Sequence, residues 1–200
     1  MQKNGLQNHL RVIEIYNAIA QLQRNGTPSI IAIDGMCGSG KSYLADLIEA
    51  RFDCNVFHMD DFFLPLEMKT KERLAQPGAN VHYERFKKEV LEPLVKQQTV
   101  IYRPYLCGKW EFGEPITVEP KKLTIIEGTY SMHPKLRDAY DLKIFLSVDD
   151  SVQRERIRIR EGEEKLKQFI EKWIPLENLY FNSLGIKALC DITLDTSEYC

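Results

Sequence analysis

The strongest constraint on how this chain folds is a glycine-rich stretch, GMCGSGKS, at residues 35–42. It matches the pattern G-x-x-x-x-G-K-[ST], in which backbone N–H groups of a curled turn point at phosphate oxygens. Roughly one chain of this length in a hundred matches by chance, as an ordinary glycine turn. Here an apolar run over 29–34 precedes the turn and a helical stretch over 41–51 follows it, as phosphate binding requires. The stretch therefore predicts a nucleotide-binding α/β domain.

Residue types in this turn have distinct physical roles. Lys41 would contact the β- and γ-phosphates of ATP, and the Ser42 hydroxyl would be a ligand of Mg²⁺. The helix that begins near Lys41 adds the positive end of its dipole. The residues expected to contact the nucleotide are Gly35, Cys37, Gly38, Ser39, Gly40, Lys41, Ser42 and Tyr43.

Strand and helix patterns alternate along the rest of the chain. We expect an N-terminal helix within 1–26, and the polar stretch 65–78 predicts a mobile loop. Further strands are expected over 54–59, 123–126, 142–148 and 190–194, a hairpin over 99–118, and helices over 83–96, 151–160 and 164–181. This alternation predicts a parallel sheet with helices on both faces. Without a linker or repeat, residues 1–200 are expected to form one domain.

Composition narrows the class of protein. A formal net charge of −2 gives no electrostatic reason to bind nucleic acid or an anionic membrane. The N-terminus lacks the apolar core of a signal peptide, and no apolar run approaches the roughly 18 residues of a membrane span. The five cysteines are widely spaced without a C-x-x-C pair, which favours reduced thiols over disulfides or a zinc site. A cytoplasmic protein is expected.

Acidic residues follow two of the predicted strands. Asp60 and Asp61 close the second strand, and Glu127 closes the strand over 123–126. Ligands of parallel α/β sheets bind beyond the carboxyl ends of the strands. Phosphoryl transfer needs one carboxylate to take the proton of the attacking hydroxyl and another beside the Mg²⁺. An acid after a strand is ordinarily a turn or capping residue, but beside a phosphate-binding turn the functional interpretation is favoured.

A run of four arginines lies on the predicted helix over 151–160. Arg156 and Arg160 share one face of that helix, and Arg154 and Arg158 share another. The run is compatible with a solvated basic face that nearby glutamates neutralise. It is equally compatible with a lid that closes over phosphates and stabilises transition-state charge.

In combination, these segments resemble the uridine kinase-like branch of P-loop kinases, which includes phosphoribulokinase and bacterial pantothenate kinase. The matching pieces occur in family order over residues 28–161: GMCGSGKS, MDDFF, PGANVHYERFKKEVLEPL, YRPYL, TIIEGTY and DLKIFLSVDDSVQRERIRIRE. The resemblance implies a P-loop NTPase fold of the nucleoside and nucleotide kinase type. That fold has a five-stranded parallel sheet and a helical lid, here at 149–164. It also implies ATP and Mg²⁺ as cofactors, with adenine near the loop after the last strand.

Residue roles follow from the same resemblance. Asp60 matches the catalytic base, with Asp61 the weaker candidate, and Glu127 matches the Mg²⁺-associated glutamate. Arg156 and Arg160 match the lid arginines. The segment 65–118 corresponds to the insertion that binds the phosphate acceptor, and the expected substrate contacts are Asp61, Phe62, Tyr83 and Tyr105.

Two departures from the family concern the acceptor. Uridine kinases carry an aspartate just before the proline of their substrate loop, which grips the ribose hydroxyls; here that stretch is Leu74-Ala75-Gln76-Pro77. Their Tyr-Asp-Phe segment corresponds to Tyr105-Leu106-Cys107. Uridine is therefore expected to be a poor acceptor, unless Glu72 or Glu84 replaces the missing carboxylate.

Three functions are compatible with these features. A small-molecule kinase explains the base, metal and lid residues together. A nucleotide-dependent switch or regulatory ATPase would need no base aimed at an acceptor, so Asp60 discriminates between the two. A kinase for nucleic-acid ends would require a basic stripe, which is absent. Neither the acceptor nor homo-oligomerisation is specified by the sequence.

Overall fold

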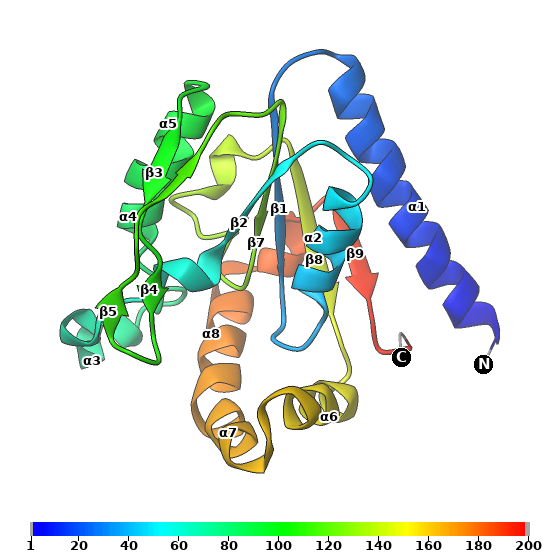
Figure 1. The fold of residues 1–200 in the computed structure, drawn as a ribbon. Helices are drawn as coiled ribbons and strands as arrows, with labels where there is room; N and C mark the ends of the chain where they lie inside the picture. The colour runs from blue at the N-terminus through cyan, green and yellow to red at the C-terminus, as the bar shows by residue number, and fades with distance from the viewer. Residues whose placement is uncertain (1, 199–200) are drawn as a thin grey trace.

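A five-stranded parallel sheet forms the centre of the computed structural model, which describes residues 2–198, with side chains from residue 11 onward (Figure 1). The strand order is β2-β7-β1-β8-β9, and every neighbouring pair is parallel. The strands are β1 (Ser29–Gly35), β2 (Asn55–His58), β7 (Leu123–Glu127), β8 (Leu142–Ser147) and β9 (Ile192–Asp195). This confirms the P-loop kinase sheet expected from the sequence.

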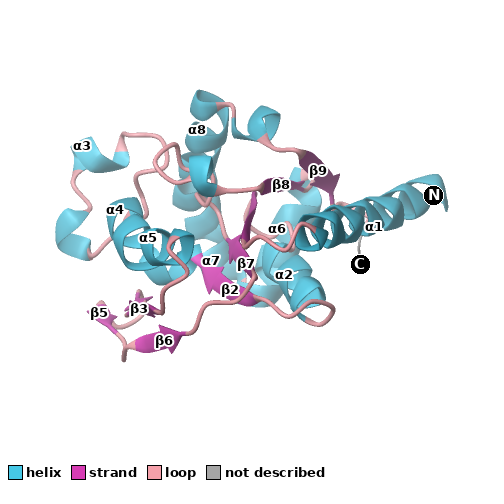
Figure 2. Ribbon diagram, turned by 90° about the horizontal axis from the view of Figure 1, so that it is seen from above, coloured by secondary structure: helices cyan, strands magenta, loops and turns pink. Residues whose placement is uncertain are grey.

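The central position of β1 follows from its apolar residues on both faces, all of which are buried. Ile31 and Ile33 pack with α1 (Gln2–Arg24) and α2 (Lys41–Glu49) on one face. Ile30 and Ala32 pack in a second core cluster on the other face. Figure 2 shows α1 and α2 on one side of the sheet and α4, α5 and α8 on the other. This confirms the expected layers of helix, sheet and helix.

Two helices expected to be regular contain a π-helical turn. The helix expected over 83–96 consists of α4 (Tyr83–Phe86), a π turn (Lys87–Leu91) and α5 (Glu92–Val95). The helix expected over 164–181 consists of α7 (Glu163–Gln168), a π turn (Phe169–Trp173) and α8 (Ile174–Leu184). In both, a proline follows the π turn, Pro93 or Pro175. Proline lacks the N–H of a regular helical hydrogen bond, so the ladder changes register there.

Residues 65–78 contain more structure than the loop expected from the sequence. They form a 3₁₀ turn (Leu66–Met68) and the short helix α3 (Lys71–Leu74). Arg73 anchors this segment because its guanidinium donates to both carboxylate oxygens of Glu84, at 2.7 and 2.9 Å. The expected hairpin over 99–118 is present as two antiparallel pairs: β3 (Val100–Tyr102) with β6 (Ile116–Val118), and β4 (Tyr105–Leu106) with β5 (Glu111–Phe112).

The remaining elements are short, except for α6 (Asp150–Glu161), which carries the arginine run. Three further 3₁₀ turns cover Met59–Phe62, Arg137–Ala139 and Ile186–Leu189. Between residues 2 and 198, no helix is both long and apolar enough to cross a bilayer. Cys37, Cys54, Cys107 and Cys190 are free thiols, and Cys200 lies outside the described residues.

Acid should weaken the fold through His133, in the loop after β7. The side chain is buried, and burial lowers its pKa to about 4. Its Nδ1 accepts a hydrogen bond from the Lys135 amide, which requires the neutral ring. The unfolded chain binds this proton near pH 6.5, so stability is complete above that value and declines as the pH falls toward 4. We expect a loss of roughly 1–3 kcal/mol from this group.

The measurement is urea unfolding at pH 7 and pH 4.5 for the wild type and His133→Gln. Glutamine keeps a hydrogen-bonding side chain but does not titrate. Between the two pH values, the free energy of unfolding should change by roughly 1–3 kcal/mol less in the variant than in the wild type. An equal pH dependence in both proteins would mean that other groups cause the acid sensitivity.

Candidate active site

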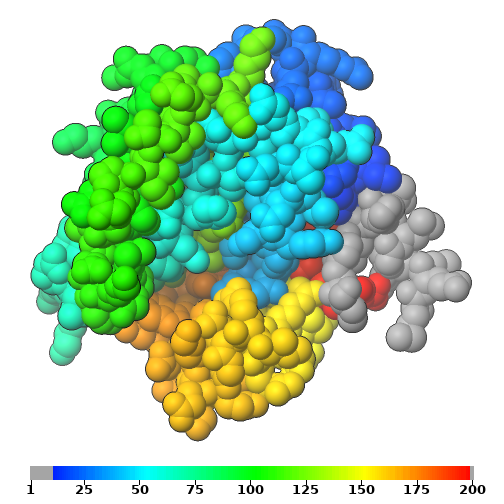
Figure 3. All heavy atoms as spheres, in the orientation of Figure 1, coloured from blue at the N-terminus to red at the C-terminus, as the bar shows by residue number. Residues whose placement is uncertain are grey.

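A cavity of about 770 Å³ opens at the carboxyl ends of the strands. Its volume is within the range of small-molecule sites. In Figure 3 the surface is recessed between the green segment around residues 100–118 and the yellow and orange helices α6 and α7. Lining residues come from the P-loop (residues 35–42), the turn after β2, the end of β7 and the helices α6 and α8. The cavity thus lies where parallel α/β sheets bind their ligands.

The P-loop curls tightly around the Lys41 side chain. Gly38 and Gly40 have φ angles of 72° and 86°, a left-handed conformation that glycine adopts without steric cost. The Lys41 Nζ donates to the carbonyl oxygens of Gly35 and Met36, at 2.9 Å each. Helix α2 begins at Lys41, so its first N–H groups and the ammonium are directed at the same end of the cavity. This arrangement is suited to bind phosphate.

Six of the residues expected to contact the nucleotide line the cavity: Cys37, Gly38, Gly40, Lys41, Ser42 and Tyr43. Gly35 and Ser39 do not line it. A Cβ on Gly35, whose φ is 144°, would collide with the Leu146 carbonyl, so this glycine is needed for the close approach of β8. Ser39 is fully buried, and its carbonyl accepts a hydrogen bond from Thr196 Oγ1 at 2.9 Å.

Oxygen ligands gather beside the start of α2. Glu127 Oε1 lies 2.6 Å from His58 Nδ1 and accepts a hydrogen bond from Ser42 Oγ at 3.3 Å. Within residues 2–198, no group of three or more His, Cys, Asp or Glu side chains is arranged to hold a metal ion. Mg²⁺ needs fewer protein ligands, because it prefers oxygen and takes the remaining ligands from phosphates and water. Ser42 and Glu127 therefore fit the ion that the sequence implies.

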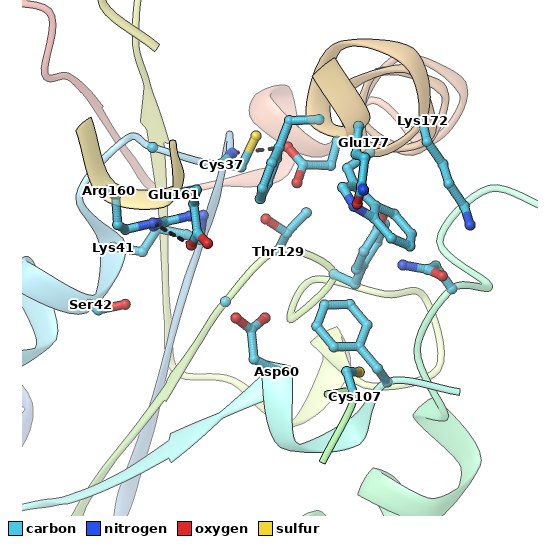
Figure 4. A pocket seen from close by; sticks show the side chains of 18 of the residues that line it. Cys37, Lys41, Ser42, Asp60, Cys107, Thr129, Arg160, Glu161, Lys172 and Glu177 are labelled. Atoms are coloured by element: carbon cyan, nitrogen blue, oxygen red, sulfur yellow. Dashed lines mark hydrogen bonds and ion pairs between the residues drawn. The ribbon is translucent and has the colours of Figure 1, made fainter. Parts of the chain in front are cut away.

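Asp60 faces the cavity from the 3₁₀ turn that follows β2, as Figure 4 shows. Its side chain is exposed to the solvent in the cavity, but the protein walls around it partly desolvate the carboxyl group and so raise its pKa. Glu127 raises it further because of its like charge, whereas Lys41, His58 and Arg160 oppose the shift. A carboxylate with a raised pKa is a better proton acceptor than an ordinary surface aspartate.

The neighbouring Asp61 lies outside the cavity lining. Its Oδ2 accepts a hydrogen bond from the Tyr102 hydroxyl at 3.0 Å, and its carbonyl accepts one from Arg85. The 3₁₀ turn directs the two adjacent carboxylates to different sides. Of the two acids considered, the geometry favours Asp60 as the group that acts on a ligand.

The arginine run divides between the cavity and solvent. Arg156 donates to the carbonyls of Gly38 and Thr196, at 3.2 and 2.6 Å, so it links α6 to the P-loop and to the chain after β9. Arg160 lines the cavity and forms an ion pair with Glu161. Arg158 instead pairs with Glu155 on the exposed side. Both arginines proposed for the lid, Arg156 and Arg160, are thus in the cavity lining.

Three further expected substrate contacts are not in the lining. Phe62 is fully buried between Tyr102 and Phe86, so it belongs to the core. Tyr105 is buried against Phe112. Tyr83 stacks on His133, with the ring centroids 3.9 Å apart. Their aromatic packing explains why these side chains are turned away from the cavity.

Several lining residues were not recognised in the sequence: Lys69, Asn80, Trp110, Lys172, Trp173 and Glu177. Glu177 begins the stretch ENLYF, whose resemblance to a protease-tag sequence is coincidental because it lies within α8. Its buried carboxylate accepts a hydrogen bond from the Cys37 N–H at 2.9 Å. In the sequence, the signal available for Glu177 was that a single acidic residue stands among the apolar positions of the helix.

Comparison with known proteins agrees with this geometry. A uridine kinase from Clostridium botulinum is 30% identical over 156 residues, which cover 69% of this chain and 71% of that protein. A uridine kinase from Clostridium perfringens is 27% identical over 170 residues, covering 76% and 81% of the two chains. No protein-family model matches the chain.

Solved structures share the fold at lower sequence identity. A possible uridine kinase from Bacillus stearothermophilus superposes with a TM-score of 0.64 at 18% identity, over 91% of this chain and all of that one. The YGR205w protein superposes with a TM-score of 0.60 at 18% identity, over 94% and 95% of the two chains. Together with the P-loop and the strand-end acids, the sequence relatives show that this chain belongs to the uridine kinase-like family of P-loop kinases.

Proposed function

We propose that this protein transfers the γ-phosphate of ATP to a hydroxyl group of a small metabolite. The observation that carries the proposal is that the Asp60 carboxylate lies in the same cavity as Lys41 and Ser42. A proton acceptor and a phosphate-binding loop are the two parts that a small-molecule kinase must bring together. A cytoplasmic location is part of this proposal.

The nucleotide phosphates would bind at the P-loop end of the cavity. Backbone N–H groups and the Lys41 ammonium supply positive charge there, and Arg156 and Arg160 approach from α6. These fixed charges stabilise a phosphoryl group as it moves between donor and acceptor. In this proposal α6, within 149–164, is the lid.

Ser42 and Glu127 would hold the Mg²⁺, which neutralises charge that develops on the phosphates. His58 contacts the same Glu127 oxygen as Ser42 does, and therefore orients the carboxylate. Asp60 would accept the proton of the attacking hydroxyl group. The acceptor must bind beside Asp60, against the wall formed by residues of 65–118 such as Leu66, Asn80 and Trp110.

This extended wall favours a kinase over a regulatory ATPase. A switch protein needs only to position a water molecule next to the γ-phosphate. Here the lining continues well past the P-loop to Cys107, Trp110 and Trp173, which leaves space for a second ligand. ATP hydrolysis at the same rate with and without every hydroxylated compound offered would favour the switch.

Uridine is expected to be turned over poorly. Neither Ala75 nor Leu106 provides a carboxylate, and neither lines the cavity. Glu84 is held by Arg73, and although burial opposes it, this contact lowers the pKa of Glu84 to about 2. Two ribose hydroxyls without partners would each lose about 1–3 kcal/mol.

The experiment is an ADP-release assay with Mg²⁺ and ATP. Uridine and cytidine at millimolar concentration are compared with pantothenate-like compounds, sugars and sugar acids. ADP release that depends on one of the other compounds supports the proposed function. Rapid turnover of uridine would show that another group replaces the missing carboxylate.

The substitution Glu127→Gln should weaken the Mg²⁺ dependence more than nucleotide binding. The amide keeps the size of the side chain but loses its charge, whereas most phosphate contacts come from backbone N–H groups. We expect the Mg²⁺ concentration for half-maximal activity to rise about tenfold or more. Thr124→Val, at a buried position of the same strand, is the control. An unchanged Mg²⁺ titration would leave Glu127 as a hydrogen-bonding structural residue.

A further inference from the structure

Two lysines lie at the end of the cavity away from the P-loop. Figure 4 shows Lys172 extending into the cavity from the side opposite Lys41 and Ser42, with Asp60 between the two sides. The Lys69 Nζ lies 5.6 Å from the centroid of the Trp110 ring and 5.8 Å from that of Trp173. The Lys172 Nζ lies 4.5 Å from the Trp173 centroid. The two ammonium groups thus share one tryptophan.

In the described part of the chain, no carboxylate forms an ion pair with Lys69 or Lys172, although other lysines are paired in this way. Burial lowers the pKa of Lys69, and the like charge of Lys172 lowers it further. Unpaired ammonium groups held near each other beside apolar rings form a site for an anion, because an anion relieves their repulsion.

A second observation points to a ligand at the same wall. Asn80 is 4% exposed and lines the cavity, and its Oδ1 has no hydrogen-bond partner among the described residues. A buried amide oxygen without a donor is unfavourable. A hydroxyl or N–H group of a bound molecule would satisfy it.

The hairpin turn between β4 and β5 sets the position of Trp110. Its φ angle is 58°, in the left-handed region that bulky side chains rarely adopt. Trp110 is the last residue of this turn, and its N–H donates to the Leu106 carbonyl at 2.8 Å. Here the conformation places the Trp110 ring in the cavity lining, next to Lys69.

We propose that the phosphate acceptor is an anionic hydroxylated metabolite, whose carboxylate or phosphate binds Lys69 and Lys172 while a polar group reaches Asn80. This inference rests on the proposed function, since Asp60 must face the hydroxyl that receives the phosphoryl group. Trp110 and Trp173 form the sides of the site. The two lysines would select against neutral compounds such as nucleosides.

The two tryptophans of the chain both line this site, so their fluorescence reports its occupation directly. The P-loop is first saturated with a non-hydrolysable ATP analogue and Mg²⁺. Inorganic phosphate or acetate is then titrated at constant ionic strength, for the wild type and for Lys69→Met/Lys172→Met. Lys71→Met/Lys167→Met, outside the cavity lining, is the matched control.

We expect a saturable fluorescence change in the wild type and the control, with affinity at least tenfold weaker in Lys69→Met/Lys172→Met. A stronger response to phosphate than to acetate would indicate a phosphorylated acceptor, and the reverse a carboxylate. The absence of saturation in the wild type, or equal affinity in both double variants, would overturn the inference.

Binding of the ATP analogue, measured in the same samples, keeps this result separate from the proposed function. Failure of the analogue to bind would contradict the kinase, whatever the response to the small anions. Matched acceptors then test selectivity in the ADP-release assay: pantothenate against pantothenyl alcohol, and glycerate against glycerol. Preference for the neutral member of both pairs would also overturn the anion site.

Discussion

Replacing Lys41 with alanine is expected to abolish phosphoryl transfer and leave the fold intact. In the structure, the Lys41 Nζ donates to two carbonyl oxygens of its own loop, those of Gly35 and Met36. No carboxylate of the described residues forms an ion pair with this ammonium group, so its charge is available to a ligand. Loss of one preorganised donor at an active site already costs about 10²–10³ in rate, and this donor also carries a full charge. We expect a loss of at least about 10³-fold.

The measurement is ADP release with the best acceptor, together with circular dichroism and thermal unfolding to confirm the fold. Lys71→Ala, on α3 outside the cavity lining, is the control for loss of a lysine and should keep its activity. Turnover near that of the wild type in Lys41→Ala would mean that the phosphate-binding assignment is wrong. A variant that does not fold would be replaced by Lys41→Met, which keeps the aliphatic chain.

The parts of the site that the sequence predicted depend on local order along the chain. A strand, a glycine-rich turn and a helix follow one another at residues 29–49, so the position of Lys41 and Ser42 could be deduced from neighbouring residues. Asp60 and Glu127 could be placed because the carboxyl ends of parallel strands share one edge of a sheet. For these residues, the sequence pattern and the sheet topology are sufficient to predict the position in the site.

The remaining parts depend on contacts between residues distant in sequence. Asp34 appeared in the sequence only as the end of a strand. Its buried carboxylate accepts hydrogen bonds from the amide of Met132 and the hydroxyl of Tyr180, at 2.9 and 2.8 Å. It thus joins β1 to the loop after β7 and to α8. Lys69 and Trp173, about a hundred residues apart, likewise meet only in the folded chain, and no local pattern reports such pairs.

The direction of individual side chains was the second feature that could not be predicted from the sequence. The segment MDDFF correctly indicated an acid at the site, but a 3₁₀ turn directs its neighbouring side chains differently. Asp60 faces the cavity, Asp61 accepts from Tyr102, and Phe62 is in the core. A shift of one residue along this turn decides between catalysis and packing. The difference is set by tertiary contacts rather than by residue type.

Replacing Asp60 with asparagine should therefore reduce turnover by about 10²–10⁴-fold, the usual contribution of a general base. Asparagine keeps the shape of the side chain but cannot accept the proton of the acceptor hydroxyl. Nucleotide affinity should remain nearly unchanged, because the P-loop supplies most of the phosphate contacts. The measurements are the rate of ADP release at saturating acceptor and the dissociation constant of the ATP analogue. Asp61→Asn, which removes a charge from the adjacent residue outside the cavity, is the matched control.

These two variants separate the base from other roles of an acidic residue. Asp61→Asn loses a carboxylate that accepts from Tyr102, so it should lower stability slightly and leave turnover within a few-fold of the wild type. If Asp60→Asn instead weakened nucleotide binding as much as turnover, Asp60 would be a metal or structural residue. If Asp61→Asn lost more activity than Asp60→Asn, the base would be the neighbouring acid, and the 3₁₀ turn would have to rearrange when the acceptor binds.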